Sequence, residues 1–270
     1  MVRYSSKKSL GQHFLYDNKI RAAIVKSAQL SSDDLVLEVG PGKGFLTKEL
    51  INNSGEVIAV EIDERLIQGL ENLSLNSKNL KIISGDILEI EINSIISEDI
   101  NYKVVANLPY YAASKIIRKF LEVAHKPTSL TVMVQLEVAN QMVASPGQMG
   151  ILSVAIQLYG NPKIVKKVSA SSFKPKPKVS SAVMNIQVHK EFQVDVLSED
   201  HFFKVVRGGF FSPRKQLRNS LSKGLNISPV QAKKCLEDSN IAPSRRPQTL
   251  SLKEWSRLHV NLMGCNFDNI

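Results

Sequence analysis

Residues 35–47 read LVLEVGPGKGFLT, an apolar run followed at once by three alternating glycines. The apolar part predicts a strand buried on both faces, and the glycines let the backbone turn tightly and approach a ligand closely. The stretch therefore predicts a strand, a ligand-binding loop and a helix that the loop opens. Phe45 stands where the dinucleotide fingerprint Gly-x-Gly-x-x-Gly has its third glycine, which argues against a nicotinamide cofactor.

The alternation of strands and helices continues along the chain. Further strands are predicted at 56–62, 80–83, 104–106 and 130–135, with amphipathic helices at 17–28 and 112–123. Asp17 and Asp63 are expected to cap the helices that follow them. This order predicts an α/β fold with a doubly wound, mostly parallel, Rossmann-like sheet.

The second half of the chain has a different pattern. Two more strands are expected at 163–168 and 180–188, whereas the apolar stretch 151–158 fits a helix or a strand equally well. From about residue 191 the sequence predicts short amphipathic helices, at 199–211, 214–223, 228–239 and 251–262. We therefore expect a ligand-binding domain over 1–190, which begins with a basic arm over residues 3–15, and a smaller helical domain over 191–270.

Four positions follow predicted strands at their carboxyl ends, the edge where open α/β sheets bind ligands. They are Gly40, Glu61, Asp86 and Asn107. Glu61 lies about 20 residues after the glycine loop, where an acid can accept hydrogen bonds from both hydroxyls of a ribose. For Asp86 two interpretations are equal, an acceptor for an adenine amino group and a simple turn residue.

Residues 104–110, VVANLPY, combine a buried strand with the tetrapeptide Asn-Leu-Pro-Tyr. Pro109 ends the strand, so Asn107 presents its amide at the sheet edge beside the aromatic ring of Tyr110. The form Asn-x-Pro-Tyr resembles a motif of methyltransferases that act on exocyclic amino groups of nucleobases. A strand-ending turn is the alternative, but the row of polar strand ends favours a ligand site.

Charge is distributed unevenly along the chain. The net charge of +10 comprises +5 over residues 1–26, −6 over 27–162, +6 over 163–189 and +5 over 190–270. Basic ends around an acidic middle favour a polyanion bound by the ends and a smaller ligand bound in the middle. We interpret the ends as nucleic-acid-binding, with general solubility as the alternative.

Two segments carry most of this basic character. In the first, Phe173 precedes three lysines that alternate with prolines, Lys174, Lys176 and Lys178. Prolines hold such a loop extended, and a phenylalanine projected from it suits stacking on an extruded base; a basic linker is the alternative. The second segment lies in the helical region and contains no acidic residue between its cations, Lys204, Arg207, Arg214, Lys215, Arg218 and Lys223. It predicts an RNA-phosphate surface.

Composition excludes several other classes. Hydrophobic residues make up 43% of the 270 residues, enough for a sizeable core. The chain has no run of about 18 apolar residues and Met1–Leu10 lacks an apolar core, so we expect no membrane span, no secretory signal and a cytoplasmic location. Cys235 and Cys265 are isolated from each other and from histidines. Both are expected to be reduced packing residues, and no metal site is expected.

Five motifs occur in order along the chain: GQHFL at 11–15, EVGPGKG at 38–44, NLPY at 107–110, FKPKPKV at 173–179 and FSPRKQLRN at 211–219. With this ordered set the sequence resembles the ribosomal RNA adenine N6,N6-dimethyltransferases, in particular the bacterial enzymes of the small subunit. The resemblance covers essentially the whole chain. It implies transfer of four methyl groups from S-adenosylmethionine to two adjacent adenines near the 3′ end of 16S rRNA, in the immature small subunit, with S-adenosylhomocysteine as product.

The resemblance also implies roles for individual residues. The family's cofactor contacts fall on His13, Leu15, Gly40, Glu61, Asp86 and Asn107. Its target-base pocket falls on Asn107, Leu108, Pro109, Tyr110 and Phe173. His13 stands where asparagine is frequent in the family, which leaves open whether its side chain or its backbone contacts the cofactor. Gln248 stands where an acidic residue is expected, a departure confined to the helical domain.

The expected mechanism is positioning of the target amine. The Asn107 side-chain oxygen and the Leu108 carbonyl would accept its hydrogens, and Tyr110 and Phe173 would sandwich the base. We expect a monomer. The alternatives are a 23S rRNA adenine methylase of the antibiotic-resistance type and an rRNA-binding assembly factor without catalysis. A nicotinamide oxidoreductase is disfavoured by the glycine spacing.

Overall fold

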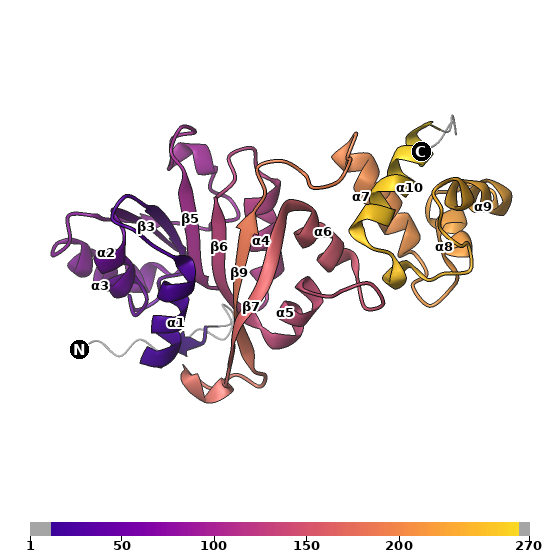
Figure 1. Cartoon of the computed structure of the whole chain (residues 1–270). Helices are drawn as coiled ribbons and strands as arrows, with labels where there is room; N and C mark the ends of the chain where they lie inside the picture. Colours follow the sequence, from indigo (N-terminus) through magenta and orange to yellow (C-terminus); the bar gives the residue numbers. More distant parts are fainter. Residues whose placement is uncertain (1–11, 265–270) are drawn as a thin grey trace. The chain divides into compact units, whose positions relative to one another are not determined.

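The computed structural model describes residues 12–264 (Figure 1). Residues 3–11 of the predicted basic arm and Cys265 lie outside the described residues. The chain divides into two compact units, the first holding residues up to Asn140 together with Asn161–Val188, the second holding Gln141–Gly160 and the residues from His189 onward. In the described part of the chain, no helix has the length and apolar character needed to span a membrane.

The first unit is built on a seven-stranded sheet with the strand order β4-β3-β2-β5-β6-β9-β7. Its strands are β2 (Leu35–Val39), β3 (Glu56–Glu61), β4 (Leu80–Ser84), β5 (Tyr102–Asn107), β6 (Ser129–Gln135), β7 (Gly160–Val168) and β9 (Ser181–Val188). Neighbours from β4 to β6 are parallel, and β9 is antiparallel to β6. The predicted doubly wound, mostly parallel sheet is confirmed.

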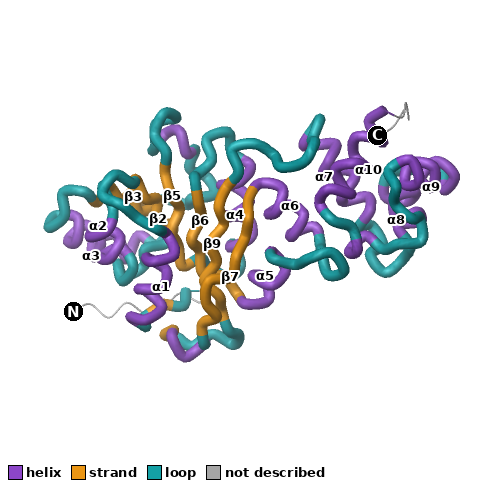
Figure 2. The backbone as a smooth tube through the Cα atoms, viewed as in Figure 1, coloured by secondary structure: helices purple, strands orange, loops and turns teal. Residues whose placement is uncertain are grey.

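Helices flank this sheet, as the purple and orange segments of Figure 2 show. They are α1 (Asn18–Ala28), α2 (Thr47–Asn53), α3 (Glu64–Ser74), α4 (Ala113–Glu122) and α5 (Leu136–Met142), with short 3-10 turns η2 (Ile92–Ser94) and η3 (Ala170–Ser172). The Asp17 carboxylate accepts from the Lys19 and Ile20 amides, and that of Asp63 accepts from the Arg65 amide, so both predicted caps are confirmed. The structure adds α5, which the sequence pattern did not predict.

The register of the central strands brings the site residues to one edge. All five residues of β2 are buried, as expected for a strand with a neighbour on each side and helices on both faces. Val39 is aligned with Val60 on one neighbour and with Ala106 on the other. Gly40, Glu61 and Asn107 are the next residue in each case, so they stand at one level along the carboxyl edge.

A second, two-stranded sheet lies apart from the large one. It pairs β1 (Phe14–Leu15) antiparallel with β8 (Phe173–Lys174), with Phe14 opposite Lys174 and Leu15 opposite Phe173. The pairing joins segments about 160 residues apart in the sequence. It was not predicted, and it decides the placement of Phe173.

The second unit is helical. It contains α6 (Ile151–Tyr159), α7 (Glu199–Gly209), α8 (Leu217–Gly224), α9 (Pro229–Asp238), η4 (Pro247–Thr249) and α10 (Leu252–Gly264). The stretch left undecided at 151–158 is a helix. The core of the second unit includes Phe202 and Trp255, both fully buried. At the crossing of α7 and α8, a Cβ atom added to Gly224 would stand 2.5 Å from the Gly208 Cα, so the two backbones touch there.

The predicted helix at 214–223 begins three residues late. Residues 211–215 form bends and turns, and Gln216 is the extended residue before α8. Pro213 favours this turn because its ring fixes the backbone outside a continuing helix. Arg214 and Lys215 therefore lie on an exposed turn before α8.

Candidate active site

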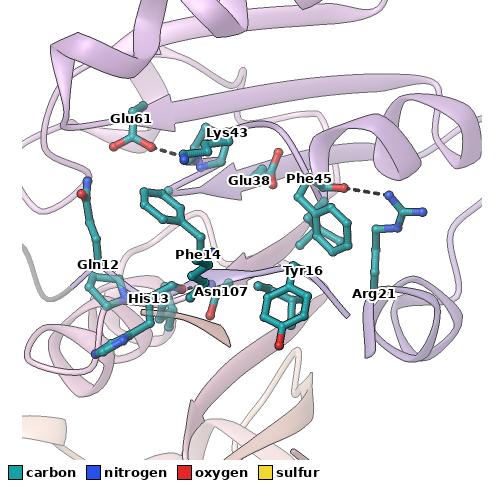
Figure 3. A pocket seen from close by; sticks show the side chains of 18 of the residues that line it. Gln12, His13, Phe14, Tyr16, Arg21, Glu38, Lys43, Phe45, Glu61 and Asn107 are labelled. Carbon is teal, nitrogen blue, oxygen red and sulfur yellow. Dashed lines mark hydrogen bonds between the residues drawn. The ribbon is translucent and has the colours of Figure 1, made fainter. Parts of the chain in front are cut away.

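A cavity of about 470 Å³ lies at the carboxyl ends of β2, β3 and β5 (Figure 3). Its volume is in the range of small-molecule binding sites. The predicted site residues that line it are His13, Leu15, Gly40, Glu61, Asn107, Leu108, Pro109, Tyr110 and Lys174. The structure thus gathers most of the predicted cofactor and base residues around one cavity.

The glycine loop forms one wall of the cavity. Gly40 and Gly42 have backbone φ angles of +67° and +61°, a region that favours glycine. A Cβ atom at position 42 would also stand 3.3 Å from the Phe14 ring. The loop therefore requires glycine for its conformation and for the close approach of Phe14.

Glu61 stands at the end of β3 and is 4% exposed. One carboxylate oxygen accepts from the Gly42 amide at 2.9 Å and the other accepts from the Asp63 amide at 2.9 Å. Burial raises the pKa of this carboxyl, and the two amides oppose the shift. These bonds hold the carboxylate in place while each oxygen keeps a lone pair for a ligand.

Glu38 is a lining residue that we did not include among the predicted site residues. It is 1% exposed, it lies in β2 facing the cavity, and its Oε2 atom has no hydrogen-bond partner among the described residues. Burial raises its pKa to about 8, with the nearby Glu61 charge adding to the effect and the Thr47 hydroxyl opposing it. An acid inside an otherwise apolar five-residue strand was the signal available in the sequence.

Asn107 and Tyr110 form the opposite side of the cavity. The Asn107 Nδ2 atom donates to the main-chain carbonyl of His13 at 3.2 Å. The Tyr110 hydroxyl lies 2.6 Å from the Ser181 hydroxyl, and its ring stacks on that of His13 with centroids 5.4 Å apart. Burial raises the pKa of Tyr110, so the phenol stays protonated.

Aromatic side chains complete the lining. Phe14, Tyr16, Phe45 and Tyr111 all contribute to the cavity wall, and Figure 3 shows Phe14, Glu38 and Phe45 around the same space. The sequence pattern did not reveal these residues. Phe14 and Tyr16 belong to a segment that we interpreted chiefly as a basic arm.

Phe173 and Asp86 differ from the expectation. Phe173 is 3% exposed and belongs to the hydrophobic core, and it is absent from the cavity lining. Its pairing with Leu15 turns the ring inward, so the expectation that it projects from its loop is wrong for this structure. Asp86 also lies outside the lining, and its Oδ1 atom accepts from the Leu88 amide at 2.9 Å. That contact is the turn role that the sequence allowed.

The basic residues lie on exposed segments of each unit. Lys174, Lys176 and Lys178 are exposed in the first unit, and Arg207, Arg214 and Lys215 are exposed in the second, where Arg218 is half-buried. Among the described residues none of these seven forms an ion pair. Their charge is therefore available to a polyanion.

Known structures resemble this chain along nearly its whole length. A dimethyladenosine transferase from Plasmodium falciparum superimposes with a TM-score of 0.80 at 25% identity, covering 93% of this chain and 98% of that one. The 23S rRNA methyltransferase ErmE superimposes with a TM-score of 0.75 at 28% identity, covering 93% and 99%.

Relatives are closer in sequence. The ribosomal RNA small subunit methyltransferase A of Dehalococcoides mccartyi strain CBDB1 is 43% identical over 96% of this chain and 89% of its own. The protein of the same name from Alkaliphilus oremlandii is 42% identical over 96% and 92%. The family model described as "Ribosomal RNA adenine dimethylase" matches residues 3–258. With the glycine loop, Glu61 and Asn107 at one sheet edge, these matches show that the chain belongs to the ribosomal RNA adenine dimethylase family.

Proposed function

We propose that this chain dimethylates N6 of two adjacent adenines in the 3′-terminal hairpin of 16S rRNA, within the immature small subunit, using S-adenosylmethionine. The observation that carries the proposal is the placement of Asn107 on the cavity opposite Glu38 and Glu61. The names of the relatives support the small subunit as the substrate. Methylation of 23S rRNA is the second candidate, supported by the likeness to ErmE at lower identity.

The cavity residues fit S-adenosylmethionine. The buried Oε2 atom of Glu38 lacks a partner, which suits a ligand ammonium group. Glu61 offers its free lone pairs to the ribose hydroxyls, and the glycine loop admits a close approach of the ligand. His13, Leu15 and Asp86 are further proposed contacts, Asp86 through its second carboxylate oxygen. When bound, the cofactor supplies an electrophilic methyl group on its sulfonium.

The protein contributes orientation of the amine. The Asn107 side-chain oxygen and the Leu108 carbonyl accept the two hydrogens of the adenine amino group, which directs the nitrogen lone pair away from the ring plane. Tyr110 supports the base by stacking, and Leu108 is 2% exposed, so water is kept from this side. After one methylation a single hydrogen remains, and one acceptor still orients the nitrogen for the second transfer.

Phe173 remains a proposed member of the base pocket only if its segment rearranges when RNA binds. In the described structure the ring lies in the core.

Exposed basic residues of both units are proposed to bind rRNA phosphates. They are Lys174, Lys176, Lys178, Arg207, Arg214 and Lys215, together with half-buried Arg218. We also propose a monomer that acts in the cytoplasm, where small subunits are assembled; sedimentation of the purified protein tests the monomer.

Labelled-methyl transfer to immature small subunits, followed by mapping of the labelled nucleotides, tests the function. We expect label on two adjacent adenines of 16S rRNA and none on 23S rRNA. Label on 23S rRNA alone would favour the second candidate. Binding to subunits without any transfer or cofactor binding would favour an assembly factor without catalysis.

Asn107→Ala tests whether the Asn107 side chain at the cavity orients the target amine. Removing one acceptor aimed at the reacting group is expected to lower kcat by about 100- to 1000-fold. Asn101→Ala is the matched control, because Asn101 is exposed and directly precedes the amino end of β5. Transfer by Asn107→Ala at the rate of the control would contradict the mechanism.

A further inference from the structure

Residues 12–17, here named the strap, run along the carboxyl edge of the large sheet. The Gln12 amide donates to Asp63, which follows β3, at 2.8 Å. The His13 carbonyl accepts from Asn107, the last residue of β5, at 3.2 Å. Figure 3 shows Gln12, His13, Phe14 and Tyr16 of the strap lining the same cavity as Glu61 and Asn107. The strap thus links the ends of two strands that carry site residues.

Residues 171–175 fasten the strap from the other side. The Tyr16 amide donates to the Ser172 carbonyl at 3.2 Å, and the Tyr16 hydroxyl donates to the Ser171 carbonyl. The Ser172 hydroxyl donates to Asp17 at 2.9 Å. Among the described residues neither Tyr16 nor Ser172 hydrogen-bonds the Asn107 amide, so their side-chain bonds can be removed without deleting the amine acceptor itself.

The contact with His13 determines which way the Asn107 amide faces. A main-chain carbonyl accepts hydrogen bonds and cannot donate them. The Asn107 atom beside it must therefore be Nδ2, which directs Oδ1 to the other side of the planar amide. Among the described residues Oδ1 has no hydrogen-bond partner. If the amide were flipped, its Oδ1 atom would face the His13 carbonyl oxygen, which repels it. The amide NH2 group would then face the substrate amine, and neither of these two donors could accept a hydrogen bond from the other.

From this geometry we infer that the main-chain carbonyl of His13 is a positioning group for methyl transfer, because it holds the Asn107 amide with its oxygen toward the target amine. The inference rests on the proposed function. Through the His13 carbonyl, the strap becomes part of the amine-acceptor site. This role is separate from any contact that the side chains of the strap make with the cofactor.

Asn107→Asp separates the two roles of the amide. Aspartate has nearly the same shape and keeps an oxygen acceptor, but it cannot donate to the His13 carbonyl. If Asn107 needed only its oxygen, this variant would stay active. We expect instead a fall in kcat of about 100-fold, similar to Asn107→Ala. Wild-type kcat in Asn107→Asp would overturn the inference.

A second variant, Tyr16→Phe with Ser172→Ala, loosens the strap at a distance. We expect kcat to fall by about three- to tenfold with Kd for the RNA unchanged, because the amide loses its fixed orientation. In the Asn107→Asp background the same pair should have no further effect on kcat, since the positioned amide is already lost. An equal loss in both backgrounds would overturn the inference. Ser94→Ala is the matched control, because Ser94 is exposed and its hydroxyl bonds the Glu91 carbonyl and not the strap.

Hydrogen exchange at the Tyr16 amide tests the contact without any substrate. This amide bonds the Ser172 carbonyl, so its exchange reports opening of the strap. We expect severalfold faster exchange in Asn107→Asp than in wild type, and unchanged exchange would overturn the inference. Wild-type protein that exchanges as expected but methylates no subunit would instead refute the proposed function alone.

Discussion

Two carboxyls, one fully buried in the first unit and one partly buried in the second, are held in opposite ways. Glu38 lies at the cavity with one oxygen unpartnered, and burial raises its pKa to about 8. Glu254 in the helical unit is also desolvated, yet the Arg245 guanidinium and the Ser251 amide lower its pKa to about 2. Its oxygens accept from Arg245 and from the amide and hydroxyl of Ser251. One carboxyl keeps an oxygen without a partner, whereas both oxygens of the other accept hydrogen bonds.

The difference separates groups kept for a ligand from groups that hold the fold together. An unpartnered buried acid opposes folding, so its retention at a cavity is explained by what it binds. A partly buried acid that accepts from an arginine and from two further donors stabilises its own surroundings. Substitution should therefore affect ligand affinity in the first unit and stability in the second.

Glu61 lines the same cavity as Glu38, and Glu61→Ala should have the largest effect on ligand affinity. Loss of a charged acceptor is expected to weaken binding of S-adenosylmethionine by about 10- to 100-fold. Isothermal titration measures the affinity, with Glu64→Ala as control because Glu64 is exposed in the first turn of α3. Equal affinities for the two variants would remove Glu61 from the site.

Glu254→Gln should act on stability alone. Removing the charge opposite Arg245 is expected to lower the free energy of unfolding by about 2 kcal/mol at pH 7, with cofactor affinity unchanged. Because the folded pKa of Glu254 is lowered, this contribution is present above pH 4.5 and declines as the pH falls toward 2. Urea unfolding measures it. Glu237→Gln is the control, since its ion pair with Lys233 is solvent-exposed, and a loss no larger than the control's would contradict the comparison.

Glu38→Gln should change the free energy of unfolding in the opposite direction, by raising it. The folded pKa of Glu38 is raised, so its contribution to stability is largest below pH 4.5 and is lost as the pH rises toward 8. Relative to wild type, the neutral variant should gain roughly 1 kcal/mol of stability per pH unit as the pH rises from 5 to 8. Urea unfolding of cofactor-free protein at both pH values tests this, with exposed Glu56→Gln as control. A destabilised variant at pH 8 would show that Glu38 serves the fold.

The smallest expected effect concerns an exposed charge. Arg214→Gln should weaken RNA binding modestly and reduce the slope of log affinity against log salt by about 1, because one phosphate contact is lost. Stability should not change, since Arg214 has no ion pair among the described residues. Titration at several salt concentrations measures the slope, with exposed Lys253→Gln on α10 as control. An unchanged slope would place Arg214 outside the RNA surface.

The sheet edge was predictable because strand ends are a local property of the sequence. Apolar runs mark the strands, and parallel pairing brings their carboxyl ends together, so Gly40, Glu61 and Asn107 could be placed side by side from the pattern. Glu38 was also visible as an acid within an apolar strand. Its missing partner was not, because hydrogen bonding depends on tertiary packing.

The prediction for Phe173 failed because its burial depends on contacts with a distant segment of the chain. Its loop was interpreted from its own prolines and lysines, which indicate an extended and exposed segment. The ring is instead buried by pairing with Leu15, far away in the sequence. The strap escaped prediction for the same reason, since its contacts with Asn107 and Ser172 join distant segments.

The course of the strap bears on how this protein can be tagged. Gln12 lines the cavity and bonds Asp63 at the sheet edge. A tag or fusion partner joined directly to Gln12 would therefore stand beside the cavity. A dye attached at the same point would report strap opening by fluorescence.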